Sequence, residues 1–489
     1  MSNLRQTKAF AFTFALIFLA LIVAFLTVFI LATVNGINEA TRLDQSKKAY
    51  YIAEAGLADA YERIVNAGLT TFASSTCANS NIPSTCTTAF IPSSTTDNGT
   101  YSVGAVNGSY TVSMVYSGSP RTNYVITSQG TYGNTSRTLQ LKIIASSFSR
   151  YAYWSQTEIN PQLGALWWIS GMMTTGPVQT NGRFNIFGNP VFNGAVAEVG
   201  SSPNYYYGTG SDPTSTTKSD PSYIFPDGLT NNAPAINLPP TSTLGDFQTV
   251  ASNGGLILTG KSTITFNSSG TVTVTGKVVD SSCKTTATYN NTTLSIPSSG
   301  VIYVQSTKTV PKCNSSSADG NATVQGTVNG QLTVAADQNV YIAGNVQYNT
   351  NPVSNPSSTD LLGLVAYNNV TVIESSAPAQ LAVQGVMVAL GGSFNVDQYS
   401  KNPDPVVVNG QTLDGANMSQ FGSLVNYASG CTGIVNSKGQ LVDGWNQVQS
   451  YDTRLLTLAP PGFPPLVNSA GQGVYAKLSI TECYSGVCG

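Results

Sequence analysis

The sequence predicts a mainly β protein that begins with one long α-helix. An uncharged run of 25 residues at 10–34 continues into a polar segment that keeps a helical pattern. Three alternating strand-like segments follow within 110–145, and after them short strands separated by Gly, Asn and Ser fill most of the chain. With 489 residues, the chain has room for two or three domains and a sizeable core.

Composition excludes several classes of function. The chain has 21 Lys and Arg, 23 Asp and Glu and no histidine, and only 9% of its residues are charged, against about 25% in an average soluble domain. Without histidine, Ser-His-Asp and Cys-His catalysis, His-ligated zinc and an imidazole pH switch are excluded. A net charge of −2 argues against a protein that coats itself in nucleic acid. We expect no cofactor.

Residues 10–34 are long enough to cross a membrane. At 1.5 Å per residue they reach about 37 Å, and a bilayer hydrocarbon core is about 30 Å thick. The apolar region of a secretory signal peptide is only about 7–15 residues long. Arg5 and Lys8 precede the run, so the positive-inside rule predicts a single-pass inner-membrane helix with a cytoplasmic amino end. A plain signal anchor is the alternative interpretation.

We expect the helix to continue through 35–68, outside the membrane. The stretch 37–66 contains no proline, and Gly68 follows it as a C-cap candidate. Its apolar residues recur with a period near 3.6 and would form one packed face. They are Leu43, Ala49, Ile52, Ala53, Leu57, Ala60, Tyr61 and Ile64.

A loop and an antiparallel sheet are expected at 69–149. Three segments alternate between apolar and polar residues and are separated by turn residues: Tyr110–Ser117, Asn123–Gly133 and Ser136–Ala145. One face of this sheet could pack on the exported half of the helix.

The region 150–465 is predicted to be a β-solenoid head, because short apolar strands with turn residues between them can stack as coils. A β-sandwich is the structural alternative. The remaining segment, 466–489, contains one more strand at Gly473–Tyr484. This strand either completes the first sheet, which would make the solenoid an insertion, or belongs to an appended tail.

Several phrases resemble one family. The leader MSNLRQTKA before Phe10 and the helix Ala49–Ile64 resemble type IV pilins, in particular PilX-type minor pilins. The phrases at Gly176–Gly194, Leu361–Val372 and Tyr451–Pro464 resemble the head of large minor pilins in the Thermus–Deinococcus DNA-uptake system. The resemblance implies a pilin-like stalk and sheet with a β-solenoid head. It also implies a role in natural transformation and a route from inner membrane to periplasm, pilus tip or cell surface. The partners implied are other pilins, a prepilin peptidase and double-stranded DNA.

The same resemblance implies that residues 1–9 are a leader removed between Ala9 and Phe10. The family usually has glycine where this chain has Ala9. Phe14 takes the fifth mature position, where major pilins carry a glutamate that neutralises the amine of a neighbouring subunit in the apolar core. A subunit at the tip has no neighbour ahead of it and needs no such carboxylate. The alternative is that the chain never enters a filament.

The seven cysteines suggest crosslinks in an exported protein. With no CxxC pair and no histidine, no metal site is expected. The expected pairs are Cys77–Cys86, Cys283–Cys313 and Cys483–Cys488, which leave Cys431 over.

Ligand-binding residues are harder to predict. Residues 150–489 carry 12 basic and 17 acidic side chains, so DNA contact would depend on a few local cations and aromatic rings. The candidates are Arg150, Tyr151, Tyr153, Trp154, Arg183, Lys218, Lys308 and Lys312.

Two other functions remain open: a tip adhesin for surfaces or glycans, and a signal-anchored β-helix enzyme. An enzyme would need paired carboxylates on neighbouring coils. The candidate aspartates are scattered singly, so a structural role in turns explains them better than a catalytic role. Calcium binding at Asp397 and Asp404 is weakly indicated. The candidate aspartates are Asp280, Asp319, Asp337, Asp397 and Asp404. We therefore expect no enzyme activity.

Overall fold

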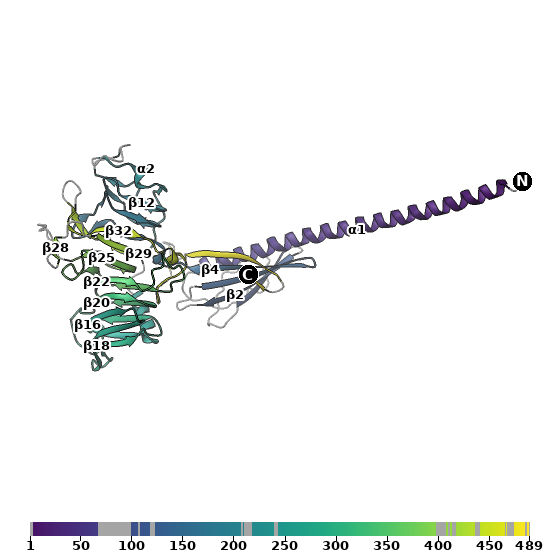
Figure 1. Ribbon diagram of the computed structural model, residues 1–489. Coiled ribbons are helices and arrows are strands. Elements are labelled where there is room, and N and C mark those ends of the chain that lie inside the picture. The colour runs from purple at the N-terminus through teal and green to yellow at the C-terminus, as the bar shows by residue number, and fades with distance from the viewer. Residues whose placement is uncertain are drawn as a thin grey trace. The chain divides into compact units, whose positions relative to one another are not determined.

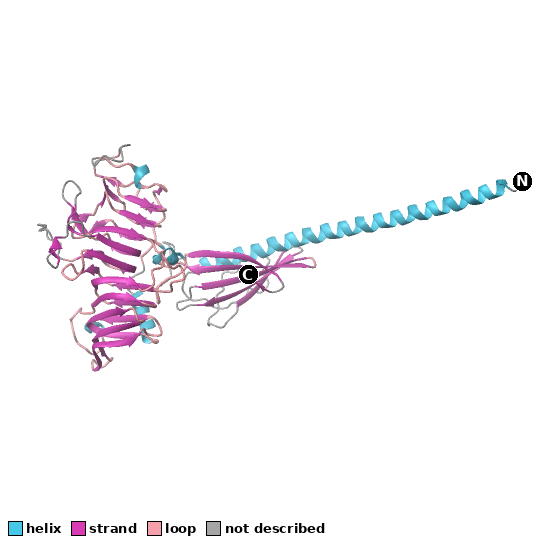
Figure 2. Ribbon diagram, in the orientation of Figure 1, coloured by secondary structure: helices cyan, strands magenta, loops and turns pink. Residues whose placement is uncertain are grey.

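The computed structural model forms two compact units. Unit 1 comprises Met1–Tyr116, Asn123–Ile143 and Lys477–Gly489, and unit 2 comprises Ser117–Thr122 and Ile144–Ala476. The described residues are 3–66, 99–105, 108–117, 123–206, 209, 218–238, 243–397, 407–408, 411–412, 417–435, 441–464, 466, 474–484 and 487–488. They are mainly strands with one long amino-terminal helix, which confirms the predicted fold class (Figures 1 and 2).

Unit 1 is a long helix with an antiparallel sheet. The helix α1 spans Asn3–Asn66 without a break. Three of the strands correspond to those predicted from sequence alternation. In sheet order the strands are β1 (Gly99–Ala105), β2 (Gly108–Ser117), β3 (Asn123–Tyr132), β4 (Thr135–Ala145), β33 (Tyr475–Tyr484) and β34 (Val487–Cys488).

The carboxyl-terminal strand shows how the two units are connected. Because β33 lies beside β4 in the sheet, the chain leaves unit 1 after β4 and returns to it in β33. Unit 2 is therefore an insertion in the chain of unit 1. Within unit 2 the two ends of this insertion are hydrogen-bonded, since the amide of Ser146 donates to the carbonyl of Val474 at 2.8 Å.

Unit 2 is a β-solenoid whose coils stack through parallel strands, which excludes the β-sandwich. The longest row of stacked strands runs from one end of the solenoid to the other. In stacking order it contains β15 (Leu229–Thr230), β13 (Val196–Glu198), β10 (Val178–Thr180), β5 (Tyr153–Thr157), β29 (Asn417–Ala428), β25 (Gln380–Ala389), β23 (Leu361–Ala366), β21 (Gln331–Ala336), β19 (Val301–Gln305) and β16 (Leu256–Asn267).

Shorter rows form the other sides of the coils. They contain β20 (Ala322–Val328), β22 (Val340–Tyr348), β24 (Val370–Val372), β26 (Phe394–Val396), β32 (Asn446–Ser450), β9 (Met173–Thr175), β12 (Val191–Asn193), β8 (Trp168–Ile169), β11 (Asn185–Phe187) and β14 (Asn204–Tyr205). Small elements at the edges are β6 (Ile159–Asn160), β7 (Gly164–Ala165), β27 (Val407–Val408), β28 (Gln411–Thr412), β30 (Gly433–Val435), β31 (Leu441–Gly444), α2 (Pro221–Ile224) and α3 (Leu244–Ser252).

The coils do not follow one another in a single direction along the solenoid. It enters at β5, in the middle of the stack, and runs to one end at β15. It then continues at β16, at the opposite end, and returns coil by coil until β29 pairs with β5. This route places β5, the first strand of the insertion, beside β29 near its end, and so brings the two ends of the inserted segment close together.

The core of unit 2 is a ladder of apolar side chains in register. One ladder stacks Leu256, Ile302, Val334, Leu364, Met387, Leu424, Tyr153, Val178, Val196 and Leu229. Corners between rows need glycine: Gly385 and Gly422 are stacked neighbours with φ of 135° and 133°, where a side chain would be strained. Such ladders bury each coil against the next.

The solenoid end at β16 is covered by an antiparallel hairpin. Strands β17 (Thr271–Val279) and β18 (Thr285–Ser295) extend the sheet beyond the last coil. The exposed residues of β18 are mostly Thr and Asn, which protect an edge strand better than apolar residues would.

Candidate assembly helix and candidate nucleic-acid interface

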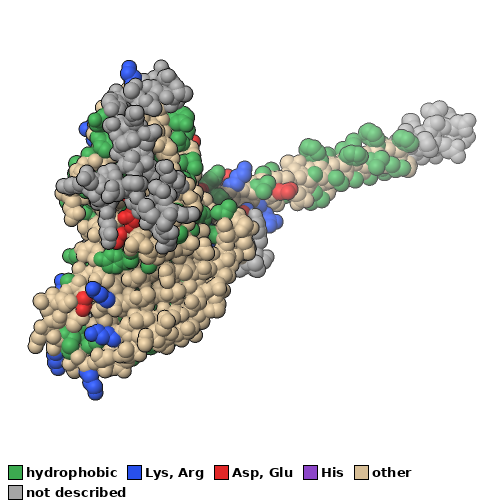
Figure 3. Space-filling view, turned by 60° about the vertical axis from the view of Figure 1, so that its left-hand side comes forward, with side chains coloured by type: hydrophobic (Ala, Val, Ile, Leu, Met, Phe, Trp, Pro, Cys, Tyr) green, Lys and Arg blue, Asp and Glu red, His purple; other side chains and the backbone are tan. Residues whose placement is uncertain are grey.

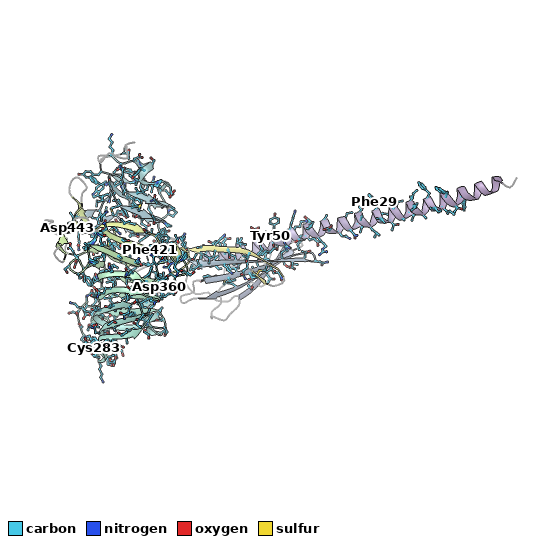
Figure 4. The ribbon with its side chains drawn as sticks, in the orientation of Figure 1. Phe29, Tyr50, Cys283, Asp360, Phe421 and Asp443 are labelled. Carbon is cyan, nitrogen blue, oxygen red and sulfur yellow. A yellow bond between two sulfur atoms is a disulfide. The ribbon has the colours of Figure 1, made fainter. Side chains whose placement is uncertain are left out.

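The first half of α1 presents its apolar side chains to the surroundings. Phe25 is 78% exposed and Phe29 is 71% exposed, and their neighbours from Phe12 to Val34 are similarly exposed (Figures 3 and 4). By length and composition the helix could cross a membrane once. The predicted cleavage pair, Ala9 and Phe10, lies within α1 near its amino end. An exposed apolar surface of this size requires lipid or other helices to cover it.

The second half of α1 packs on the sheet of unit 1 through a narrow stripe. Ala49, Ala53, Leu57, Ala60 and Ile64 are each at most 3% exposed and follow one another at intervals of three or four residues. These five positions confirm most of the predicted packed face. Leu43 does not belong to it, because the residue is 59% exposed. The stripe begins only where the sheet begins to cover the helix.

Small residues let the helix and sheet backbones approach closely. At Gly130 on β3, a β-carbon would lie 2.2 Å from the carbonyl oxygen of Ala49 and 2.3 Å from the amide nitrogen of Ala53. No side chain fits in that space. The sheet residues around it, among them Val112, Ile126 and Leu141, are fully buried. The helix is therefore held against the sheet in one register.

A buried polar contact fixes the same interface. The Tyr110 hydroxyl donates to Asp59 Oδ2 at 3.0 Å, and Arg63 Nε donates to Asp59 Oδ1 at 2.9 Å. Burial, with the Asp59 charge beside it, raises the pKa of the Tyr110 phenol well above its ordinary value. On the returning strand β33, the ammonium of Lys477 lies 4.3 Å from the centroid of the Tyr61 ring.

Exposed apolar residues on α1 continue beyond the apolar half. Ile37, Leu43 and Tyr51 are 60%, 59% and 65% exposed. Tyr51 packs edge-to-face with Tyr50 at a centroid distance of 5.9 Å. A membrane anchor alone would not need these residues, whereas a helix that packs beside other helices would use them.

Two of the predicted DNA-contact residues are unavailable. Tyr153 is 3% exposed, its hydroxyl donates to Glu158 and lies within hydrogen-bonding distance of the Ser429 hydroxyl, and Trp154 is fully buried. The prediction was wrong for these two rings because both belong to the solenoid core and cannot stack on a base. Arg150 is half-buried and bonds to the Ser146 hydroxyl at 3.1 Å, and Tyr151 lies under its guanidinium.

Arg183 and Lys218 are both exposed. Arg183 donates to the carbonyl oxygens of Ser202 and Pro203, which positions the neighbouring loop. Lys218 lies just before α2. Both belong to the part of unit 2 near β13 and β15, at the end opposite to β16.

Lys308 and Lys312 lie in the loop after β19, at the β16 end of the solenoid, together with three lysines that the sequence did not single out. All five side chains are exposed, and within the described part of the chain none forms an ion pair with a carboxylate. The cluster, named here the lysine end, consists of Lys261, Lys277, Lys284, Lys308 and Lys312. Figure 3 shows blue side chains gathered at the corresponding lower end of unit 2.

Strand pairing and a close contact at Gly260 bring Lys261, Lys277 and Lys308 near one another, and the Cys283–Cys313 disulfide joins the segments of Lys284 and Lys312. The register of β16 and β17 pairs Thr259 with Lys277. A β-carbon at Gly260, beside Lys261, would lie 3.7 Å from the Thr307 hydroxyl, beside Lys308. Residues so close in space could not be recognised from sequence, since Lys261 and Lys308 lie on different coils.

Disulfides occur at two of the three expected pairs. Cys283 and Cys313 are bonded, which joins the turn before Lys284 to the loop at Lys312 (Figure 4). Cys483 and Cys488 are bonded across the β33–β34 hairpin. Cys77 and Cys86 lie outside the described residues.

The remaining cysteine, Cys431, is a free thiol. Burial raises the pKa of this thiol, and its Sγ lies 3.1 Å from the carbonyl oxygen of Gly433, to which it donates. A raised pKa disfavours the thiolate, which is the reactive form.

The predicted structural role of the aspartates is visible at four positions. Asp280, Asp319, Asp337 and Asp397 each accept at least one backbone amide in a turn. Asp404 lies outside the described residues. Among the described residues no group of three or more Cys, Asp or Glu is placed to hold a metal ion.

Sequence reasoning missed the buried acids Glu158 and Glu198. Each is at most 1% exposed, and burial raises the pKa of both. Their only signal was their position within strand-like segments.

The chain was compared with family models, curated proteins and solved structures. A family model described as a domain of unknown function (DUF4900) matches residues 107–201, which include β2 to β4 and the first coils of unit 2. No curated protein matches the chain. Among solved structures, the competence-associated pilin ComZ from Thermus thermophilus is similar at a TM-score of 0.36 and 14% identity, with 90% of this chain and 98% of ComZ covered.

Proposed function

We propose that this protein is a minor pilin, made as a single-pass inner-membrane precursor and assembled at the tip of a type IV pilus or competence pseudopilus. The observation that carries the proposal is the unbroken helix α1, whose apolar half is exposed while its second half packs on a sheet. A prepilin peptidase would cleave between Ala9 and Phe10. Other pilins would then cover the exposed apolar surface.

The tip position is supported by residue 14 and by the size of unit 2. Phe14 is 64% exposed and carries no charge that could neutralise the amine of a subunit ahead of it. Packed helices lie about 8–10 Å apart, whereas a head of about 330 residues has a radius of gyration of about 20 Å. Heads of that size would crowd one another if every subunit carried one.

A direct test examines the mature chain in isolated fibres. We expect purified pili to contain the protein in small amount, with Phe10 as its first residue by mass spectrometry. A mature chain that still starts at Met1 and is absent from fibres would leave only a membrane-anchored surface protein.

For DNA uptake, we propose that the lysine end contacts the phosphate backbone of double-stranded DNA. Residues 150–489 are net acidic, but at the lysine end the five exposed lysines outnumber the nearby carboxylates of Asp280, Asp319 and Asp337, which leaves a local excess of positive charge. The logarithm of the DNA association constant falls as the logarithm of the salt concentration rises, and each phosphate that a lysine neutralises adds about 0.9 to the magnitude of this slope. No catalytic role is part of this proposal.

The DNA proposal is tested by replacing all five lysines of the lysine end with glutamine. We expect binding of duplex DNA to lose most of its salt dependence, with the slope falling by about 3–4 in magnitude. The matched control is Arg183→Gln with Lys218→Gln, at the opposite end of unit 2, which should change the slope by less than about 1. If the control variant loses the slope instead, the interface has been placed at the wrong end.

A further inference from the structure

A pocket lies in the middle of the solenoid, where the two runs of coils meet. It has a volume of about 50 Å³, and its lining comes from β5 and β8 on one side and from β26, β29 and β32 on the other. A cavity needs only about 10–15 Å³ to hold a water molecule. The pocket therefore has room for several waters, or for the edge of one small ring.

One wall of the pocket is aromatic and held rigidly. Trp168 is 8% exposed, and its indole nitrogen donates to Glu158 Oε2 at 3.3 Å. The Tyr153 hydroxyl donates to Glu158 Oε1 at 3.1 Å. At the rim, the partly exposed Trp167 packs edge-to-face on Tyr206 at 5.3 Å, and Tyr206 is itself 56% exposed. Trp167 thus belongs to the pocket lining and also contacts an exposed aromatic ring.

The opposite wall offers neutral hydrogen-bonding groups. Asn426 belongs to the lining, and its Oδ1 accepts the amide of Phe394 at 2.8 Å, which fixes the side-chain amide in place. The Thr432 hydroxyl donates to Gln447 Oε1 at 3.3 Å, which leaves its oxygen as an acceptor. Among the described residues, the lining contains no Lys, Arg, Asp or Glu. An amide and a hydroxyl in the same lining can together donate to and accept from a ligand hydroxyl group.

We propose that this pocket binds one residue of a neutral saccharide. A sugar ring would lay its C–H face on Trp167 and direct hydroxyl groups to Asn426 and Thr432. An aromatic platform with a few fixed neutral polar groups gives such a ligand both contact area and orientation. This inference goes beyond the proposed pilin function, and would give unit 2 a glycan-binding surface separate from the lysine end.

The proposal can be tested with the full chain in detergent micelles. The chain has four tryptophans, and two of them line the pocket, so tryptophan fluorescence should respond to a bound sugar. The probes are D-glucose, D-galactose and N-acetyl-D-glucosamine. For so small a ligand we expect saturation with a Kd on the order of 1 mM for at least one sugar. No response to any of the three up to about 100 mM would overturn the proposal.

Variants separate this site from the rest of unit 2. We expect Trp167→Ala to weaken sugar binding at least about tenfold, and Thr432→Val, which keeps the shape but loses the hydroxyl, to weaken it about threefold. The matched control is Tyr427→Ala on the same strand as Asn426, 44% exposed and outside the pocket lining, which should leave binding unchanged. Thermal unfolding of each variant shows whether it is folded.

Two results would contradict the proposal even if sugars bind. One is that the control Tyr427→Ala weakens sugar binding as much as Trp167→Ala does. The other is binding of indole, an apolar probe, that saturating sugar does not displace. The pilin proposal is tested separately, by whether isolated fibres contain the protein. A Trp167→Ala chain that enters fibres but no longer binds sugar would support both proposals, and loss of fibre entry alone would leave the pocket unaffected.

Discussion

The two units are stabilised by cores of different construction. In unit 1 a single stripe of buried residues on α1, three of them alanines, lies against one face of a sheet, and backbones approach closely at Gly130. In unit 2 apolar ladders run through every coil from β15 to β16, so each buried residue has similar neighbours above and below. The first core depends on one contact surface, and the second repeats its contacts.

This difference indicates where each unit is sensitive to substitution. A close backbone approach has no room for an added atom, so one methyl group at the helix–sheet interface should be costly. A ladder distributes its stabilisation over many nearest-neighbour contacts, and its weak points are the ends, where one face of the last coil has no neighbour.

The sharpest test of the comparison is Gly130→Ala. The added β-carbon would lie 2.2 Å from the Ala49 carbonyl oxygen, so the helix must separate from the sheet or the strand must shift. We expect a loss of about 4 kcal/mol in the stability of unit 1, near the upper limit for single substitutions. Chemical denaturation followed by circular dichroism measures it.

The matched control is Gly245→Ala in unit 2, where nothing lies within 4 Å of the added carbon. This glycine is in the helix α3, so alanine should be neutral or stabilising by about 0.5–1 kcal/mol. If Gly130→Ala behaves like this control, the interface in unit 1 is looser than the structure shows.

The disulfides provide a second comparison between the units. In the chain-entropy model, the Cys283–Cys313 bond, with a sequence separation of 30, should contribute about 3.6 kcal/mol. The Cys483–Cys488 bond, with a separation of 5, should contribute about 2.1 kcal/mol. We expect the double serine variant in unit 2 to lower stability more than the one in unit 1. Denaturant titration without reductant measures both losses. The reverse order would show that the disulfide at the solenoid end stabilises unit 2 less than the disulfide in the β33–β34 hairpin stabilises unit 1.

Much of this architecture could be predicted from local patterns. Uncharged residues 10–34, the 3.6-residue period ending at Ile64 and the alternation in β2 to β4 all act over short distances in the chain. The head was recognised as a solenoid for the same reason, since each coil carries its own short strands and turn residues.

What could not be predicted depends on contacts between distant segments. The pairing of Tyr153 with Leu424 joins the two runs of coils, and no local pattern records it. That pairing buries Tyr153 and Trp154, which in the sequence resemble a surface aromatic cluster beside Arg150. It also creates the pocket between Trp167 and Asn426. The lysine end likewise combines residues from several coils.

The smallest expected effect comes from a buried acid, because acidic side chains have different charged neighbours in the two units. In unit 1, Asp59 is paired with Arg63. In unit 2, Glu374 is 8% exposed and neighbours Asp443 and Asp397, and burial, followed by repulsion from those two charges, raises its pKa to about 7. The folded state therefore holds this proton more tightly than the unfolded chain, whose Glu pKa is about 4.3.

The sign of the pH effect follows from that difference. The contribution to stability is greatest below about pH 4.3 and is lost as the pH rises through about 7. Between pH 5 and pH 8 we expect the unfolding temperature of unit 2 to fall by about 2–4 °C, and Glu374→Gln, which stays neutral, to remove most of that fall. Calorimetry of both chains measures it. In the wild-type chain, ionisation of Glu374 adds a third negative charge beside Asp443 and Asp397, and the glutamine variant cannot add it. If the unfolding temperature of the variant falls as steeply with pH, the pH dependence belongs to another group.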